Sequence, residues 1–127
     1  MLSTKSLAAW ALAATLLALL STSAFAGTSS LALNQLGQGL RMGDQVTYTA
    51  YTTRTDRPWA KTECFQSGKL VYKQYHGLFP GYFTDPVFTL GPTALWTSGG
   101  ASCTGTLLYF DKNGNERSLA TTSFLVQ

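Results

Sequence analysis

Apolar and polar residues alternate along most of the chain after residue 27, and this alternation limits the possible folds more than any other feature. Residues 46–51 show it most clearly, because the even positions hold Val46, Tyr48 and Ala50 while the odd positions hold threonine or tyrosine. Side chains of an extended strand point alternately to its two faces, so the pattern is typical of a strand with one buried face. No window keeps the period of an amphipathic helix, and the abundant threonine favours strands. The chain is therefore predicted to be all-β.

Turn signals separate the expected strands at intervals of roughly ten residues. The strands are expected over residues 31–34, 46–51, 59–66, 69–75, 87–90, 101–110 and 115–126. About seven short antiparallel strands in a chain of this length predict a sandwich of two sheets.

Two hairpins are the strongest local predictions. Ser67-Gly68 suits a two-residue turn in which glycine supplies positive φ, and Asn113-Gly114 is the typical sequence of a tight hairpin turn. The residue pairs expected across these turns are Phe65 with Leu70, Cys64 with Val71, Leu108 with Leu119, and Cys103 with Phe124.

Residues 1–26 have the three-part layout of a secretory signal peptide. Lys5 precedes an apolar run over residues 7–20, and the small-residue ending Ala24-Phe25-Ala26 follows it. We expect cleavage before Gly27, which leaves one β-domain over residues 27–127 that is secreted or periplasmic. The apolar run is short for a bilayer span and no second long run follows it, so no membrane insertion is expected after cleavage.

Cys64 and Cys103 are the two cysteines of the chain, and both follow the leader. An even number of cysteines in an exported protein predicts one intramolecular disulfide. A reactive thiolate is a weaker interpretation of Cys64, because the neighbouring carboxylate of Glu63 disfavours a second negative charge. The bridge is expected to stabilise the domain by roughly 4 kcal/mol through loop closure.

Residues 27–127 resemble an immunoglobulin-like or fibronectin-like sandwich. The stretches 64–72 and 96–103 are also similar to small secreted immunoglobulin-like proteins of bacteria and their phages. In antibody-type domains the first cysteine lies on the second strand and a tyrosine stands two residues before the later one. Here Cys64 falls on the third expected strand and Ala101 stands at the tyrosine position. The resemblance therefore concerns architecture and implies no mechanism.

Charge excludes nucleic acid as an expected partner. The formal net charge of the chain is only +3, and the basic residues are scattered along it. A nucleic-acid partner usually requires basic residues clustered on one surface. The nearest approach to a basic cluster, Arg54, Arg57 and Lys61, is interpreted as a solvated turn.

Residues suited to catalysis are sparse. His76 is the one histidine, and no nucleophile, phosphate-loop or metal-binding spacing accompanies it. Several acidic residues lie in expected turns, where aspartate is favoured for local hydrogen bonds. We expect a non-enzymatic protein with no catalytic residues, metal ligands or cofactors. The alternative is a small extracytoplasmic enzyme or enzyme inhibitor that uses His76 with nearby acids such as Asp85.

Segment 72–88 is the strongest functional candidate, because it combines many aromatic residues with glycine and proline. Aromatics on such a loop can stack on a sugar or anchor a protein partner. The candidate ligand-binding residues are Tyr75, His76, Phe79, Tyr82 and Phe83.

A structural interpretation of the same segment competes with this one. It places Tyr72 and Phe88 in the core and folds Phe79 and Phe83 back as a lid. The residues expected to stay exposed are Tyr75, His76 and Tyr82. Trp96, near the second cysteine, is expected to be a core residue.

These observations favour a secreted binding or structural module that presents segment 72–88 to an unknown protein or carbohydrate. A self-associating subunit is a further possibility, because the long final strand could accept a neighbour if it lies at a sheet edge.

Overall fold

The computed structural model describes residues 28–81 and 86–127, and all regular structure in this part of the chain is β-strand. The strands are β1 (Ser29–Leu33), β2 (Gln45–Val46), β3 (Tyr48–Thr52), β4 (Trp59–Gln66), β5 (Lys69–Gly77), β6 (Phe88–Thr89), β7 (Ala101–Phe110) and β8 (Glu116–Val126). Every pairing between them is antiparallel. The prediction of an all-β fold is confirmed for the residues that the structure describes. The expected leader, residues 1–26, lies outside the described residues. Within those residues, no helix is long and apolar enough to cross a membrane.

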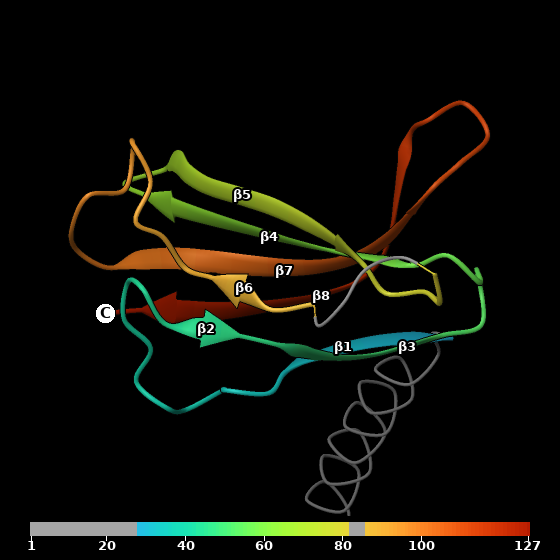
Figure 1. Cartoon of the computed structure of the whole chain (residues 1–127), viewed down its shortest axis with the longest axis horizontal. Helices are drawn as coiled ribbons and strands as arrows, with labels where there is room; N and C mark the ends of the chain where they lie inside the picture. The colour runs from blue at the N-terminus through green and yellow to red at the C-terminus, as the bar shows by residue number, and fades with distance from the viewer. Residues whose placement is uncertain (1–27, 82–85) are drawn as a thin grey trace, which may run out of the picture.

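The strands form two facing layers (Figure 1). One layer is a four-stranded sheet in the order β5-β4-β7-β8. The other holds two short sheets, in which β1 pairs with β3 and β2 pairs with β6. Both β5 and β8 are edge strands of the larger sheet, so the long final strand does lie at an edge.

The strand expected over residues 46–51 is divided between two partners. Val46 pairs with Phe88 of β6, whereas Tyr48 pairs with Leu33 of β1. Thr47 lies between the two ladders, and its backbone N–H donates to the side chain of Gln35 at 2.8 Å. This polar anchor lets one extended segment join both short sheets of the layer.

Both hairpins form, but each contains a register shift. The turn at Ser67-Gly68 has positive φ at both residues, 50° and 78°, as a tight hairpin turn requires. In this hairpin Phe65 pairs with Leu70 as expected. Cys64 pairs with Tyr72, because Val71 is an extra residue in a β-bulge.

The second hairpin shows the same kind of difference. Cys103 pairs with Phe124 as predicted. The predicted pairing of Leu108 with Leu119 is wrong, because a register shift next to Leu107 places Ser118 opposite Leu108. A bulge of this kind moves every later residue of the strand by one position.

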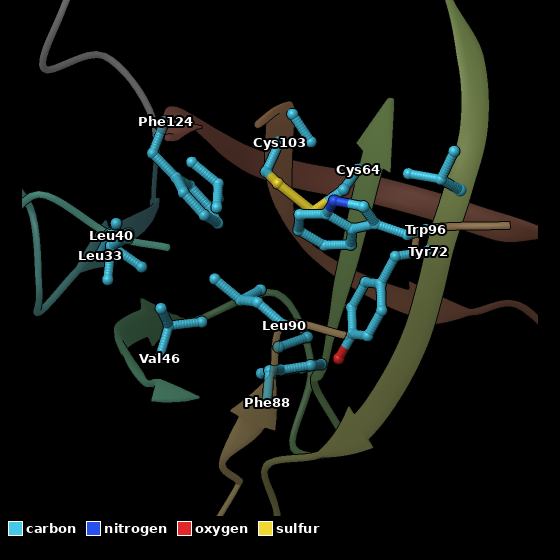
Figure 2. Close-up of a cluster of buried hydrophobic side chains, with 14 residues drawn as sticks. Leu33, Leu40, Val46, Cys64, Tyr72, Phe88, Leu90, Trp96, Cys103 and Phe124 are labelled. Atoms are coloured by element: carbon cyan, nitrogen blue, oxygen red, sulfur yellow. A yellow bond between two sulfur atoms is a disulfide. The ribbon is translucent and has the colours of Figure 1, made fainter. Parts of the chain in front are cut away.

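The hydrophobic core lies between the two layers (Figure 2). Trp96 and Phe88 are the largest side chains with no exposed surface. Tyr72 is also buried, and its ring meets Trp96 edge-on with 6.2 Å between centroids. The predicted core positions of Trp96, Tyr72 and Phe88 are therefore confirmed.

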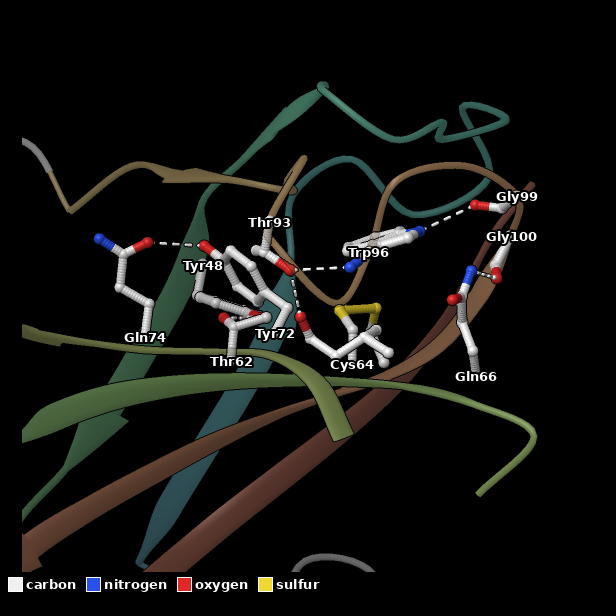
Figure 3. The surroundings of a disulfide bond; sticks show 12 residues. Tyr48, Thr62, Cys64, Gln66, Tyr72, Gln74, Thr93, Trp96, Gly99 and Gly100 are labelled. Atoms are coloured by element: carbon white, nitrogen blue, oxygen red, sulfur yellow. Dashed lines mark hydrogen bonds between the residues drawn. A yellow bond between two sulfur atoms is a disulfide. The ribbon is translucent and has the colours of Figure 1, made fainter. Parts of the chain in front are cut away.

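Cys64 and Cys103 form the predicted disulfide. They stand directly opposite each other on β4 and β7, with their Cα atoms 4.0 Å apart. The bridge thus lies within one sheet, whereas the bridge of antibody domains joins the two sheets. Trp96 lies beside the two sulfur atoms (Figure 3). A disulfide of this kind persists in oxidising, extracytoplasmic compartments.

Candidate functional site

The structure divides the residues predicted for a binding loop between two faces of the larger sheet. Tyr75 and His76 are consecutive residues of β5, so their side chains point to opposite faces. Tyr75 pairs with Lys61 and lies on the outer face, away from the second layer. Phe79 joins the same outer group through Trp59. Tyr82 and Phe83 lie outside the described residues.

His76 packs toward the core instead of standing exposed. Its ring meets Phe88 edge-on, with 4.5 Å between centroids. Its Nε2 atom is buried and has no hydrogen-bond partner among the described residues. The expectation that His76 is exposed is wrong, because the alternation along β5 turns its ring toward the second layer.

An aromatic cluster covers one end of the outer face. Trp59 is its centre, with ring centroids 5.6 Å from Phe79 and 5.7 Å from Phe110, both edge-on. Tyr75 lies beside Phe110 at 6.2 Å, and the guanidinium of Arg57 lies 5.6 Å from the Phe79 ring. Such contacts stabilise the cluster beyond simple burial. Tyr75 is consequently half-buried and not exposed as predicted.

A charged group lies beside these aromatics and includes a residue that sequence reasoning placed in a turn. Lys61 is on β4, and its Nζ lies 2.8 Å from Glu116 and 3.4 Å from Glu63. Its side chain is 12% exposed, so the interpretation of Lys61 as part of a solvated turn is wrong. The hydroxyl of Tyr75 donates to the other oxygen of Glu116.

The curvature of the β7–β8 hairpin makes these contacts possible. Glu116 begins β8, yet it contacts side chains of β4 and β5, although β7 lies between these strands and β8 in the sheet. Figure 1 shows the hairpin turning away from the plane of the sheet. The turn is held by Asp111, whose carboxylate accepts hydrogen bonds from the backbone of Asn113 and Asn115 and from Arg117.

Protonation in this group follows from the contacts. The hydrogen bond from Lys61, followed by that from Tyr75, lowers the pKa of Glu116 below its ordinary value. Burial raises the pKa of Tyr75, and the nearby negative charge of Glu116 adds to that shift. Burial opposes the charge of Lys61, but its bonds to Glu116 and Glu63 outweigh this and raise its pKa. Near neutral pH the group therefore pairs a charged Lys61 with a charged Glu116 beside a protonated Tyr75.

A groove runs between β5 and loop 93–95. Its volume is about 470 Å³. The lining residues are Leu70, Val71, Tyr72, Lys73, Gln74, Thr93, Ala94 and Leu95. Two of these apolar side chains stand in solvent, with exposed fractions of 37% for Leu70 and 58% for Leu95. Exposed apolar residues beside a groove are typical of a binding surface.

The loop beside this groove is held rigidly (Figure 3). The Thr93 hydroxyl donates to the Val71 carbonyl at 2.7 Å and accepts from the backbone N–H of Trp96 at 2.9 Å. On the other wall, the Tyr72 hydroxyl donates to the Gln74 side chain at 2.7 Å. Burial raises the pKa of Tyr72 to about 12, so this hydroxyl keeps its proton. These contacts hold both walls of the groove in place.

Sequence reasoning found one wall of this groove and missed the other. Tyr72 and the residues after it stood out as an aromatic segment, but loop 93–95 carried no signal beyond Gly91-Pro92. Glu116 was also missed, because its contacts depend on how the hairpin bends. In the described part of the chain, no group of His, Cys, Asp and Glu could hold a metal ion.

Comparisons with models of known protein families, with curated protein sequences and with solved structures found no match to this chain.

Proposed function

We propose that this chain is an extracytoplasmic, non-enzymatic binding module with an immunoglobulin-like fold. Its partner, a protein or a carbohydrate, binds along β5 at the edge of the larger sheet. The residues of β5 from Tyr72 onward are the first part of segment 72–88. The observation that carries the proposal is the groove beside β5 with Leu70 and Leu95 standing in solvent.

The strand arrangement supports the immunoglobulin-like part of the proposal. The order β8-β7-β4-β5 corresponds to the sheet of strands G, F, C and C′ in a variable-type domain. The second layer, with β3 and β2 running between β1 and β6, corresponds to strands A, B and E. Trp96 packs on the disulfide, although it comes from the loop before β7 and not from the third strand.

The placement of the titratable residues supports a binding role over catalysis. His76 packs against Phe88 on the inner face of the sheet, whereas Glu63 and Glu116 lie on the outer face with Lys61. Acid–base chemistry requires such groups within hydrogen-bond reach of one another or of a common substrate. We therefore expect His76→Ala to leave the binding activity intact.

A partner search with matched variants tests the proposal. The purified protein is applied to host extracts and to a glycan panel, beside a Lys73→Glu/Leu95→Ser variant. Tyr51→Ser is the control, because Tyr51 is 62% exposed but lies on β3 of the other layer. We expect a partner that the native protein and the control capture and the double variant loses. Equal capture by all three proteins contradicts the proposed surface.

A further inference from the structure

We infer that β5 binds its partner by strand addition, and that the partner is an extended peptide segment in which apolar and acidic side chains alternate. This inference rests on the proposed function, because it names the class of partner for the same surface.

The first step is to establish which backbone groups of β5 point away from the sheet. Directly opposite residues only 4.0 Å apart, as Cys64 and Cys103 are, form a non-hydrogen-bonded pair in an antiparallel ladder. The backbone groups of Cys64 therefore point toward β5, where Tyr72 is its partner. The direction of the backbone groups alternates along a strand. The N–H and C=O groups of Lys73 and Tyr75 therefore point away from β4, toward the open edge of the sheet.

Two hydrogen bonds agree with this assignment. The backbone N–H of Leu78 donates to Pro58 at 2.9 Å, so Leu78 faces β4, as the even-numbered residues from Tyr72 onward should. The Val71 carbonyl faces the opposite side, where it accepts a hydrogen bond from the Thr93 hydroxyl.

The edge of β5 is thus covered at Val71 and open beyond it. Among the described residues, no other strand pairs with β5 besides β4, and no loop bonds to the backbone of Lys73 or Tyr75. The unpaired groups of an edge strand recruit another strand, and β5 carries two features that limit nonspecific pairing, the bulge at Val71 and the side chains of Lys69 and Lys73. A strand that adds here must therefore complement the positive charge of the edge. An extended peptide satisfies the unpaired backbone groups directly, which a sugar ring does not do at strand spacing.

The side chains beside the edge specify what such a peptide carries. On the groove side, the added strand meets Tyr72, Ala94 and Leu95, and these lining residues suit apolar side chains. On the outer side it meets Lys73, whose ammonium lies 5.6 Å from the Tyr75 ring. Neither Lys73 nor Lys69 forms an ion pair within residues 28–81 and 86–127. The charge of Glu116 acts on Lys73 from a distance, and Glu63 stands opposite Lys73 on β4. Acidic side chains at alternate positions of the peptide supply the direct ion-pair partners that these two lysines lack.

Charge also argues against a second copy of this chain as the occupant. The larger sheet has two edge strands that a second copy could offer, β5 and β8, and neither residues 69–77 nor residues 118–126 contain aspartate or glutamate. The end of the β8 edge is closed, because the Gln127 N–H donates to the Leu40 carbonyl at 2.7 Å.

Fluorescence anisotropy with labelled peptides tests the inference. The probe alternates valine and glutamate over about eight residues, the length of a typical strand. One control has the same composition in two blocks, and another replaces glutamate by lysine. We expect both controls to bind at least about tenfold more weakly, and a Lys69→Glu/Lys73→Glu variant to prefer the lysine peptide. Equal binding of the alternating and block peptides overturns the inference.

Backbone methylation of the peptide tests strand addition without changing the protein. Methylating the amides that face β5 should weaken binding about fivefold to tenfold for each hydrogen bond lost, whereas methylating the intervening amides should have little effect. Equal effects of the two sets overturn strand addition. If Lys73→Glu/Leu95→Ser still abolishes capture of a partner in that case, the proposed binding surface stands and only the mode is wrong. Self-association that the Lys73→Glu change abolishes also overturns the inference, in favour of a second copy.

Discussion

Trp96 connects the disulfide to the rest of the core. It has no exposed surface, and its indole N–H donates to the Gly99 carbonyl at 2.9 Å. A buried indole needs such a partner, because an unpaired N–H in the core costs free energy. The side chain therefore stabilises both the packing of the two layers and the course of the loop that follows it.

Replacing this side chain should be strongly destabilising. We expect Trp96→Ala to lower the free energy of unfolding by about 3 to 5 kcal/mol, because it leaves a large cavity beside Tyr72 and the disulfide. Urea denaturation followed by circular dichroism measures the change. Leu95→Ala is the control, since Leu95 is largely in solvent and should change stability by less than about 0.5 kcal/mol. A small effect at Trp96 would show that the core closes without it.

Glu116 should give the protein a stability term that depends on pH. Its pKa is lowered in the fold from the ordinary value of 4.5, so near that pH the folded state binds fewer protons than the unfolded state. The stabilisation is complete above about pH 4.5 and is lost as the pH falls through the lower folded value. Solvent screening keeps it below about 1 kcal/mol.

A comparison with Glu116→Gln isolates this term. The difference in unfolding free energy between native protein and variant should be largest near neutral pH and should shrink below about pH 4.5. Lys112→Ala is a suitable control, because Lys112 lies exposed in the same hairpin turn. A difference that stays constant down to acidic pH would mean that the Lys61 and Tyr75 contacts do not favour the carboxylate.

At the scale of elements, Gly105 sets how closely the two layers approach each other. It lies on β7, opposite Thr122 of β8. A Cβ atom at this position would lie 2.5 Å from the ring of Tyr48, which crosses from β3 and hydrogen-bonds to Thr62 at 2.7 Å. A glycine inside a strand often marks such a close approach.

Adding a methyl group at this contact should therefore separate the layers. We expect Gly105→Ala to lower the free energy of unfolding by about 1 to 3 kcal/mol, in the range of overpacked cores. The same change should cost much less in a Tyr48→Ala background, because the clash is then gone. Ser102→Ala, on the outer face of the same strand, should be nearly neutral. An additive double-mutant cycle would contradict the assignment.

The elements also show how far sequence reasoning reaches. Alternation and turn residues predicted both hairpins, the number and expected export of the cysteines predicted the disulfide, and the preference of large aromatic residues for the interior predicted the core positions of Trp96 and Phe88. They did not predict the extra residue at Val71, because a bulge depends on the fit of two strands and not on one local pattern. The division at Thr47 was missed for a similar reason, since it depends on the side chain of Gln35.

The candidate site was predictable only in part. The aromatic residues of β5 were found, but the alternation along the strand was not applied to them, so Tyr75 and His76 were assigned to one surface. The partners that decide their exposure come from distant segments, Glu116 on β8 and Phe88 on β6. Such contacts follow from the three-dimensional arrangement of the layers and leave no mark in the neighbouring sequence.

At the scale of the whole molecule, the disulfide joins the two central strands of the larger sheet, whereas the second layer is held to it by packing and by hydrogen bonds such as that between Tyr48 and Thr62. It closes a sequence separation of 39 residues. The residues inside this closed segment include β5, β6 and the loop that carries Trp96. In the unfolded state the bridge therefore restricts the conformations of the segment that supplies much of the hydrophobic core.

Removing the bridge should cost much of the stability. We expect the Cys64→Ala/Cys103→Ala variant to lose roughly 4 kcal/mol of unfolding free energy by loop-closure entropy. Urea titrations of the native protein with and without reductant provide the second measurement, and the reduced protein should resemble the double variant. Unchanged stability in both would show that the unfolded chain is already compact without the covalent link.

The position of the bridge also determines how the molecule carries mechanical load. When the chain is pulled between β1 and β8, tension passes from β4 to β7 through the sulfur atoms and bypasses residues 65–102. β5 and loop 93–95 lie inside this bypassed segment. Stretching can therefore separate β1 and β3 from the larger sheet without placing tension on the backbone of β5.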